Sequence, residues 1–341
     1  MYKVQFITHA DQDRISRQTK GYSGISNCGK YQFYLNGKVE NPDFLIVQNK
    51  WLKKKISCNV APENTILLIT EPRSVVNFPK KYRDQFGLVC SCQGGVRHKN
   101  VIHSFPILPW YIGGQQADGT YLPSYDMLKN GPAPQKTKLI SVITSNKVFT
   151  KGHQDRIRFV EKLKAYYGDK LDVYGRGFND FKDKWDVIAP YKYNIVIENS
   201  AADHYWTEKL SDCYLAGTFP IYYGCTNVHA YFPENAYKTI DIYDFEAAVS
   251  VIDAAIANEE SGKNQLVLQE CKQRVLDDYN LVNVLAKYCD GLNPDAKKER
   301  VTLKPSITIL DWYNLYLYAV KRNFYLLKAF LGSVKKGKAL V

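Results

Sequence analysis

The sequence predicts an α/β protein in which two parallel-sheet units are joined by a linker. The chain has 341 residues, more than the roughly 250–300 at which a single hydrophobic core usually stops growing. Short apolar runs alternate with polar, helix-like segments, as in parallel strands connected by helices. A stretch rich in proline, glycine and lysine, residues 119–138, separates two such sets of runs. We therefore expect two α/β units with a cleft between them.

Each expected element follows from a local pattern. The first set of apolar runs predicts strands at residues 3–8, 43–49, 65–70 and 86–91. The second predicts strands at 139–145, 171–175, 193–199, 219–224 and 239–245, and a helix at 153–167. Thr207 is a favourable N-cap and Gly217 stands where a glycine ends a helix, so a further helix is expected between them. The predicted organisation is a unit at 1–130, a unit at 131–300 and a tail at 301–341.

The net charge of +12 is concentrated near the end of the chain, where residues 296–341 hold ten Lys/Arg and two Asp/Glu. Apolar and aromatic residues alternate with these cations, which favours a basic amphipathic helix at an anionic membrane surface. A C-terminal helix packed on the body fits the same pattern. Basic residues interleave with aromatic ones only here, so we expect no nucleic-acid partner. The sequence contains no run of about 18 uncharged apolar residues, so no membrane span is predicted.

The cysteines and histidines do not predict a metal site. The eight cysteines include no CxxC pair, and the six histidines lack the spacing of metal ligands. Asp11 and Asp13 form a DxD at the start of the chain, which we interpret as a surface loop. The N-terminus lacks the pattern of a signal peptide. Reduced thiols, no metal, no cofactor and a cytoplasmic location are therefore expected, with possible attachment to the inner face of the membrane through the tail.

The junction after the predicted strand 193–199 combines charged and aromatic residues at the start of a helix. A cation such as Lys209 is unfavourable in a first helical turn, and a bound diphosphate at the free N–H groups would reverse that penalty. Glu208 is suited to accept hydrogen bonds from a ribose diol. The alternative is an ordinary amphipathic helix with a surface ion pair.

Three other strand ends carry candidate ligand residues. Arg176 lies between two glycines, which suits a phosphate contact or, alternatively, a simple turn. Ser145 and Asn146 follow a strand and could bind a ligand or cap a solvated loop. Glu71 ends a strand before Pro72, where it could serve as a general base or as a structural carboxylate.

Several motifs, in order, resemble one family. The run YKYNIVIENS…DHYWTEKLSDCYLAGTFPIYYG, with SNK…GHQDRIRFVEKL…LDVYGRG before it and EPRSVVNFPKKYRDQFGLV in the first half, resembles glycosyltransferase family 10, the α-1,3-fucosyltransferases. The likeness covers roughly residues 65–245 and is closer on the side of the sugar donor. The chain is similar to the bacterial branch, because it shows no N-terminal anchor.

The resemblance implies a fold, a reaction and a set of site residues. The fold would be GT-B, and the reaction an inverting, metal-independent transfer of fucose from GDP-fucose to a hydroxyl of a glycan such as lipopolysaccharide. Glu71 would be the general base and Arg176 a diphosphate contact, with the remaining donor residues being Ser145, Asn146, Glu198, Asn199, Tyr205, Thr207, Glu208 and Lys209. The alternatives are a relative that uses another nucleotide sugar and a non-catalytic protein that binds glycans or nucleotides.

Overall fold

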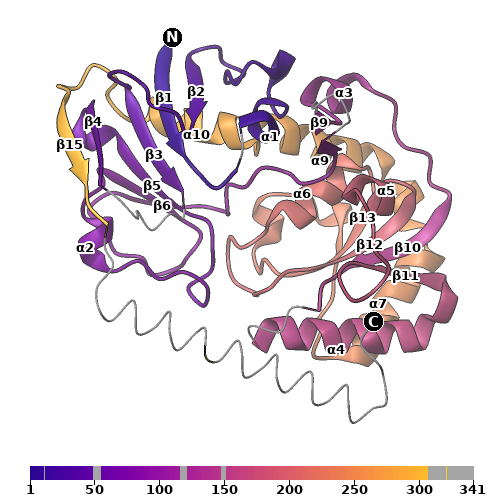
Figure 1. The fold of residues 1–341 in the computed structure, drawn as a ribbon. Coiled ribbons are helices and arrows are strands. Elements are labelled where there is room, and N and C mark those ends of the chain that lie inside the picture. Colours follow the sequence, from indigo (N-terminus) through magenta and orange to yellow (C-terminus); the bar gives the residue numbers. More distant parts are fainter. Residues whose placement is uncertain (11, 49–54, 116–120, 147–150, 306–319, 321–341) are drawn as a thin grey trace.

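A computed structural model describes the chain except for residues 11, 49–54, 116–120, 147–150, 306–319 and 321–341. Two parallel sheets lie side by side, the first built from the N-terminal part and the second from the middle of the chain (Figure 1). The predicted amphipathic tail falls almost entirely outside the described residues and stays a prediction. No helix in the described ranges is long and apolar enough to cross a membrane.

The first sheet has six strands in the order β2-β1-β3-β5-β6-β7, all paired in parallel. The strands are β1 (Tyr2–Ile7), β2 (Tyr31–Leu35), β3 (Phe44–Gln48), β5 (Thr65–Ile69), β6 (Leu88–Ser91) and β7 (Val101–His103). Every residue of β3 and β5 is buried, which explains their continuous apolar sequences FLIVQ and TILLI. Four of these strands confirm the predicted runs, whereas β2 and β7 were not predicted.

The second sheet has five parallel strands in the order β11-β10-β12-β13-β14. They are β10 (Lys138–Ile143), β11 (Leu171–Tyr174), β12 (Tyr191–Ile197), β13 (Phe219–Tyr223) and β14 (Lys238–Thr239). The strand predicted at 239–245 is wrong beyond Thr239. The Asp241 side chain accepts a hydrogen bond from the Tyr243 N–H, and Asp244 caps the helix that follows, so turn and cap chemistry end the strand.

The helices are α1 (Gln12–Ser16), α2 (Lys80–Arg83), α3 (Tyr125–Asn130), α4 (Lys151–Tyr167), α5 (Lys184–Ile188), α6 (Glu208–Leu215), α7 (Phe245–Ala257), α8 (Glu260–Lys263), α9 (Gln265–Asp277) and α10 (Leu281–Asp290). The predicted helices at 153–167 and after Thr207 are confirmed as α4 and α6. Gly217 follows α6 with φ +61°, the left-handed conformation expected of a terminating glycine. The predicted linker at 119–138 contains α3, which Ser124 caps.

The chain returns to the first sheet after α9. Strand β15 (Glu299–Leu303) pairs antiparallel with β4 (Ile56–Val60), far from it in sequence. On α10, the Tyr288 hydroxyl donates to Ser104 Oγ at 2.7 Å and Asp290 accepts from the Tyr31 hydroxyl at 2.8 Å. The C-terminal part of the second predicted unit thus packs on the first sheet. We call the part of the molecule around the first sheet the first half and the part around the second sheet the second half; α10 links the two (Figure 1).

A strap at residues 104–113 connects the two sheets and is held from both sides. From the first half, Arg17, which is fully buried, donates to the carbonyl of Ile112 at 2.7 Å. From the second half, Asp212 on α6 accepts hydrogen bonds from the N–H groups of Tyr111 and Ile112 at 2.7 and 3.1 Å. These contacts fix the path of the strap relative to both sheets.

Aromatic rings pack where the strap meets the second half. Phe105 stacks on Trp206 with ring centroids 4.4 Å apart, and Tyr231, Phe232 and Tyr279 contact Trp206 edge-on. Trp206 is 1% exposed. It therefore belongs to the core between the halves and not to the wall of a ligand site.

Lys136 is a partly buried lysine that has no carboxylate partner among the described residues. Its Nζ donates to the carbonyls of Ala189 and Ala216, the C-cap residues of α5 and α6, and to Thr218 Oγ1, at 2.7–2.8 Å. A cation at helix C-termini satisfies unpaired carbonyls and complements the helix dipoles. Burial nevertheless lowers the pKa of Lys136 from 10.5 to about 8.

This lowered pKa predicts how stability depends on pH. Between about pH 8 and pH 10.5 the unfolded chain holds the proton more tightly than the folded protein, so the contribution of Lys136 to the free energy of unfolding rises with pH. We expect Lys136→Met to lower the free energy of unfolding by about 1–3 kcal/mol, with a deficit that grows from about pH 7.5 to about pH 10. Urea denaturation, with exposed Lys192→Met as the control, measures both. A deficit independent of pH would contradict the assignment.

Candidate active site

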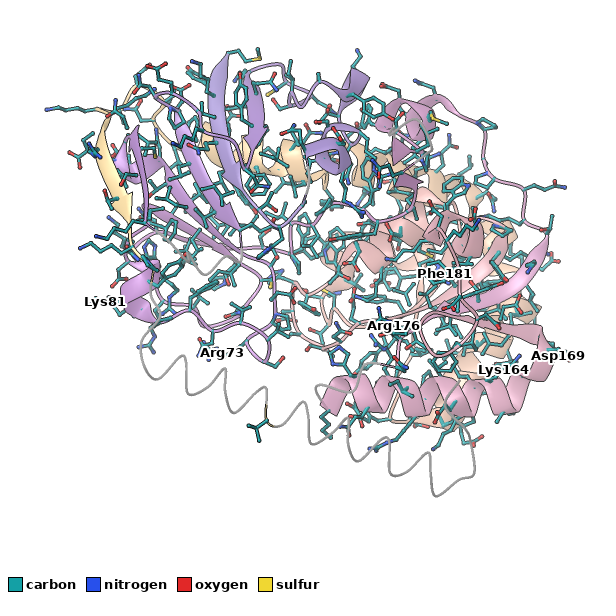
Figure 2. All side chains as sticks on the ribbon, viewed as in Figure 1. Arg73, Lys81, Lys164, Asp169, Arg176 and Phe181 are labelled. Carbon is teal, nitrogen blue, oxygen red and sulfur yellow. The ribbon has the colours of Figure 1, made fainter. Side chains whose placement is uncertain are left out.

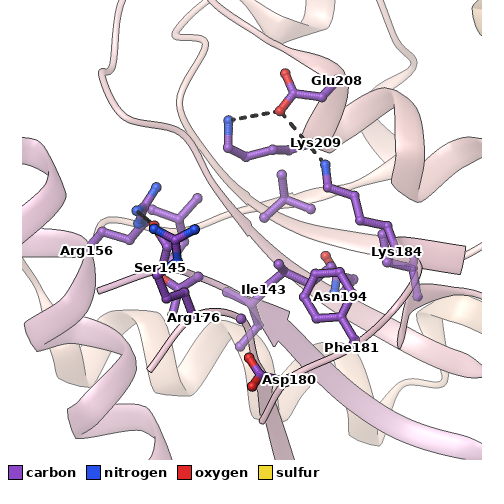
Figure 3. A pocket seen from close by; sticks show the side chains of 16 residues that line it. Ile143, Ser145, Arg156, Arg176, Asp180, Phe181, Lys184, Asn194, Glu208 and Lys209 are labelled. Atoms are coloured by element: carbon purple, nitrogen blue, oxygen red, sulfur yellow. Dashed lines mark hydrogen bonds and ion pairs between the residues drawn. The ribbon is translucent and has the colours of Figure 1, made fainter. Parts of the chain in front are cut away.

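A cavity of about 440 Å³ lies at the carboxyl edge of the second sheet, within the roughly 300–1,000 Å³ range of small-molecule sites. Its floor comes from the ends of β10 and β12, and its walls come from α4, α5, α6 and the loop after β11. In the close-up view, Arg156, Ser145 and Arg176 lie together on one side, and Lys184, Glu208 and Lys209 lie on the other (Figure 3). The cavity therefore has cationic groups on two opposite walls.

The first wall depends on two loops that touch. The Thr144 N–H donates to the Tyr174 carbonyl, and the Asn146 N–H donates to the Arg176 carbonyl. Gly175 has φ +119°, and a Cβ there would lie 1.7 Å from the Thr144 carbonyl oxygen, so only glycine permits this approach. The contact positions the exposed Arg176 at the cavity.

Arg156 is the second arginine of this wall and is much more firmly held. It lies on the inner face of α4 and is 5% exposed. One Nη donates to Asn199 Oδ1 at 2.6 Å, and the other lies 3.5 Å from Ser145 Oγ. Burial lowers the pKa of Arg156, whereas Glu198 and Tyr205 oppose that shift. A guanidinium fixed in this way is well prepared for an anionic ligand.

The opposite wall is organised by the buried carboxylate of Glu198. Glu198 accepts hydrogen bonds from the Thr207 N–H at 2.8 Å, from the Thr207 hydroxyl at 2.9 Å and from Lys209 Nζ at 2.9 Å. Its side chain is inaccessible to solvent and it does not line the cavity. Glu198 therefore orients Thr207 and Lys209 from behind.

The start of α6 differs from the free N-terminus that the sequence predicted. Thr207 caps the helix by accepting from the Lys209 N–H, and the Thr207 N–H is itself taken by Glu198. The unfavourable position of Lys209 in the first turn is offset by carboxylates. Burial alone would lower the pKa of Lys209, but Glu198 and Glu208 raise it. The cavity thus faces the Lys209 ammonium more than the backbone N–H groups of the helix.

Lys184 links this wall to the strap. Its Nζ donates to Asp212 Oδ2 at 2.8 Å and lies 3.9 Å from Glu208 Oε1. Burial would raise the pKa of Glu208, but Lys209 and Lys184 lower it, so Glu208 is held ionised at the cavity. Because Asp212 also binds the strap, the cavity and the connection between the halves share one charged network.

Glu71 approaches this site from the first half. Burial raises the pKa of Glu71, the Glu208 carboxylate raises it further, and Lys209 opposes the shift. Tyr205 is 3% exposed, and its pKa is raised by burial and then by Glu198 and Glu71. Glu71 is thus within electrostatic reach of the cavity residues, so the carboxyl ends of the two sheets face each other.

The structure sorts the sequence-predicted residues into three groups. Ser145, Arg176, Glu208 and Lys209 line the cavity. Glu198, Asn199 and Thr207 support the lining from behind, and Tyr205 is buried within electrostatic reach of Glu198 and Glu71. Asn146 packs beside Gly177 and is outside the lining.

Several lining residues were missed by the sequence interpretation, among them Arg156, Asp180, Phe181 and Lys184. Arg156 belongs to the buried face of α4 together with Phe159, Val160 and Leu163, whereas the neighbouring Ile157 is only half-buried. A cation in a helical stripe that follows a site strand is the signal that could have identified it. Within the described ranges, no three His, Cys, Asp or Glu side chains converge as metal ligands.

Two parallel α/β units with facing carboxyl edges, a cavity on the second and a C-terminal return to the first define a GT-B glycosyltransferase fold. A comparison with models of known families indicates the same class of protein. Residues 133–260 match the model of glycosyltransferase family 10 (fucosyltransferase), C-terminal part. Residues 133–260, which contain the second sheet and all the residues that line the cavity, are therefore similar to the C-terminal part of that family.

Individual relatives match over short stretches. The GDP-fucose protein O-fucosyltransferase 3 of Danio rerio is 39% identical over 56 residues, 16% of this chain and 12% of that protein. The α-(1,3)-fucosyltransferase FucT of Helicobacter pylori is 35% identical over 77 residues, 23% of this chain and 16% of that protein. The human 4-galactosyl-N-acetylglucosaminide 3-α-L-fucosyltransferase 9 is 28% identical over 116 residues, 33% and 31% of the two chains. The chain thus spans at most about a third of these relatives.

A solved structure of an α1,3-fucosyltransferase with GDP-fucose superposes with a TM-score of 0.47 at 16% identity, covering 78% of this chain and 81% of that chain.

The contacts of Glu198 predict a structural effect that can be measured without any ligand. Replacing Glu198 by Gln keeps its size but leaves the Lys209 ammonium without its hydrogen-bonded counter-charge in a buried position. We expect the free energy of unfolding to fall by about 1–3 kcal/mol in urea denaturation. Glu161→Gln, an exposed glutamate on α4, serves as the control. Equal stability of the Glu198 variant and the wild type would contradict the orienting role.

Proposed function

We propose that the protein transfers fucose from GDP-fucose to a hydroxyl of a glycan acceptor, with inversion at the anomeric carbon. The observation that carries this proposal is the cavity of a domain similar to family 10, with fixed cations on two walls and a carboxylate facing it from the other half. The donor binds in the cavity, and the acceptor lies between it and Glu71.

The charges suggest how the donor lies. On the α6 side, Glu198, Glu208 and Asp212 outnumber Lys184 and Lys209, so that wall alone carries one negative charge in excess. A diphosphate therefore needs the two arginines of the opposite wall, Arg156 and Arg176. Glu208 is then free to accept hydrogen bonds from the ribose diol.

The reaction follows from this placement. The acceptor oxygen attacks the anomeric carbon while Glu71 takes its proton, and the bond between that carbon and the diphosphate oxygen breaks. The transition state has oxocarbenium character, as in glycoside hydrolysis. Arg156, Arg176 and Lys209 stabilise the negative charge that develops on the departing GDP, and we propose that no divalent cation is required for this.

Donor identity is tested by nucleotide binding. We expect GDP to raise the midpoint of thermal unfolding and UDP to leave it unchanged. Arg176→Ala should weaken GDP binding about tenfold, since a charge-assisted hydrogen bond contributes about 1.5–3 kcal/mol and this side chain is exposed. Lys192→Ala, on the opposite edge of the same sheet, is the control. A midpoint that responds to UDP but not to GDP would instead favour another nucleotide sugar.

The role of Glu71 is tested by turnover. Glu71→Gln should reduce GDP release from GDP-fucose in the presence of acceptor by about 100-fold or more, while GDP still shifts the unfolding midpoint. Because burial raises the pKa of Glu71 and the base must be ionised, kcat/KM should decline on the acid side at a pH above the usual carboxyl range of about 4.3. Glu40→Gln, an exposed glutamate of the first half, is the control. Full turnover by Glu71→Gln would remove the base assignment.

A further inference from the structure

A group of exposed cations follows Glu71 along the chain. Residues 71–99 contain six Lys/Arg and two Asp/Glu, and residues 296–341 hold all of the remaining excess, so the rest of the chain has equal numbers of basic and acidic residues. We call this segment's cations the basic rim: Arg73, Lys80, Lys81, Arg83, Arg97 and Lys99. Outside the tail region, the net positive charge of the protein is therefore concentrated beside the candidate base.

The fold brings the two parts of the basic rim together. They follow β5 and β6, which are neighbours in the first sheet. Gln93, after β6, donates to the carbonyls of Glu71 and Val76, after β5, at 2.8 and 2.7 Å. Arg73 and Lys81 lie along the same lower side of the first half, with Arg73 nearer the second half in this view (Figure 2).

Most of these cations have no partner among the residues that the structure describes. Lys80 pairs with Asp84, and Arg83 donates to the Phe78 carbonyl. Within the described part of the chain, no ion pair or side-chain hydrogen bond is formed by the exposed residues Arg73, Lys81, Arg97 and Lys99. Burial lowers the pKa of Arg83, the Asp84 carboxylate opposes that shift, and the charge of Arg73 lowers the pKa further, so Arg73 and Arg83 lie close enough to repel each other.

We propose that the basic rim binds phosphate or carboxylate groups on the acceptor, so that the preferred acceptor is an anionic glycan. The inference rests on the proposed function, because it assumes that the acceptor hydroxyl lies at Glu71. A glycan whose hydroxyl lies at Glu71 must place its neighbouring sugars near Arg73, only two residues away. A neutral glycan would leave the repulsion within the rim uncompensated, whereas an anionic one relieves it.

The test compares three ligands by titration calorimetry with the full chain. They are the disaccharide galactosyl-N-acetylglucosamine, the same disaccharide bearing one phosphate, and the same disaccharide extended by glucuronic acid. The variant Arg73→Ala/Arg97→Ala removes two rim charges. The variant Lys170→Ala/Lys192→Ala removes two exposed charges from the amino edge of the second sheet and is the matched control.

We expect an anionic ligand to bind the wild type more tightly than the neutral disaccharide, and the rim variant to lose about three- to tenfold of that affinity. Added salt should reduce the difference, and the control variant should behave as wild type. The phosphate and glucuronate arms show which anion the rim prefers. The inference would be overturned if the wild type bound all three ligands with equal affinity. It would also be overturned if the rim variant lost as much affinity for the neutral disaccharide as for the anionic ones.

Two further measurements separate the alternatives. If the rim variant loses retention on phosphatidylglycerol vesicles but binds the anionic disaccharides as wild type does, the rim contacts membranes and the inference is wrong. GDP binding is followed in parallel by thermal unfolding. Failure of GDP to bind would contradict the proposed function, whereas the titrations would still decide whether the rim recognises anionic glycans.

Discussion

The buried carboxylate of Asp212 is the contact on which both the cavity and the connection between the halves depend. One oxygen accepts from two N–H groups of the strap and the other accepts from Lys184. Burial raises the pKa of Asp212, and Lys184 opposes that shift. Because Asp212 lies one turn after Glu208 and Lys209 on α6, the helix that carries these two cavity residues also anchors the strap. A shift of the strap relative to α6 would therefore disturb the position of the donor-side charges.

Most charged groups of the cavity already have a hydrogen-bonding partner in the protein before a ligand binds. Glu198 holds Lys209, Asp212 holds Lys184, and Asn199 holds Arg156. Fixed groups of this kind need little reorganisation when charge develops on a leaving group. Arg176 is the exception, since it is exposed at the cavity and is positioned mainly through its backbone. We infer that Arg176 is the cation that adjusts to a ligand, whereas Arg156 provides a fixed reference for it.

The sequence predicted elements whose cause is local and missed features that depend on distant contacts. Continuous apolar runs such as TILLI identified buried parallel strands, and Thr207 identified the start of α6. The roles of Arg156 and Asp212 were not predicted, because their partners Asn199 and Tyr111 lie 43 and 101 residues away in the sequence. Glu198 was assigned to the ligand, although its oxygens are taken by Thr207 and Lys209. A motif therefore identified the right neighbourhood without distinguishing lining residues from supporting ones.

The pKa of Glu71 depends on residues from both halves of the molecule. The carboxylate belongs to the first half, but Glu208, Lys209 and Glu198, which influence its pKa, belong to the second. Separating the halves would return Glu71 to solvent and weaken it as a base. A diphosphate in the cavity would add negative charge near Glu71 and partly neutralise Lys209, and both effects would raise the pKa of Glu71 further. Under the proposed function, Glu71 would thus be a stronger base when the donor is bound, which is when deprotonation of the acceptor is productive.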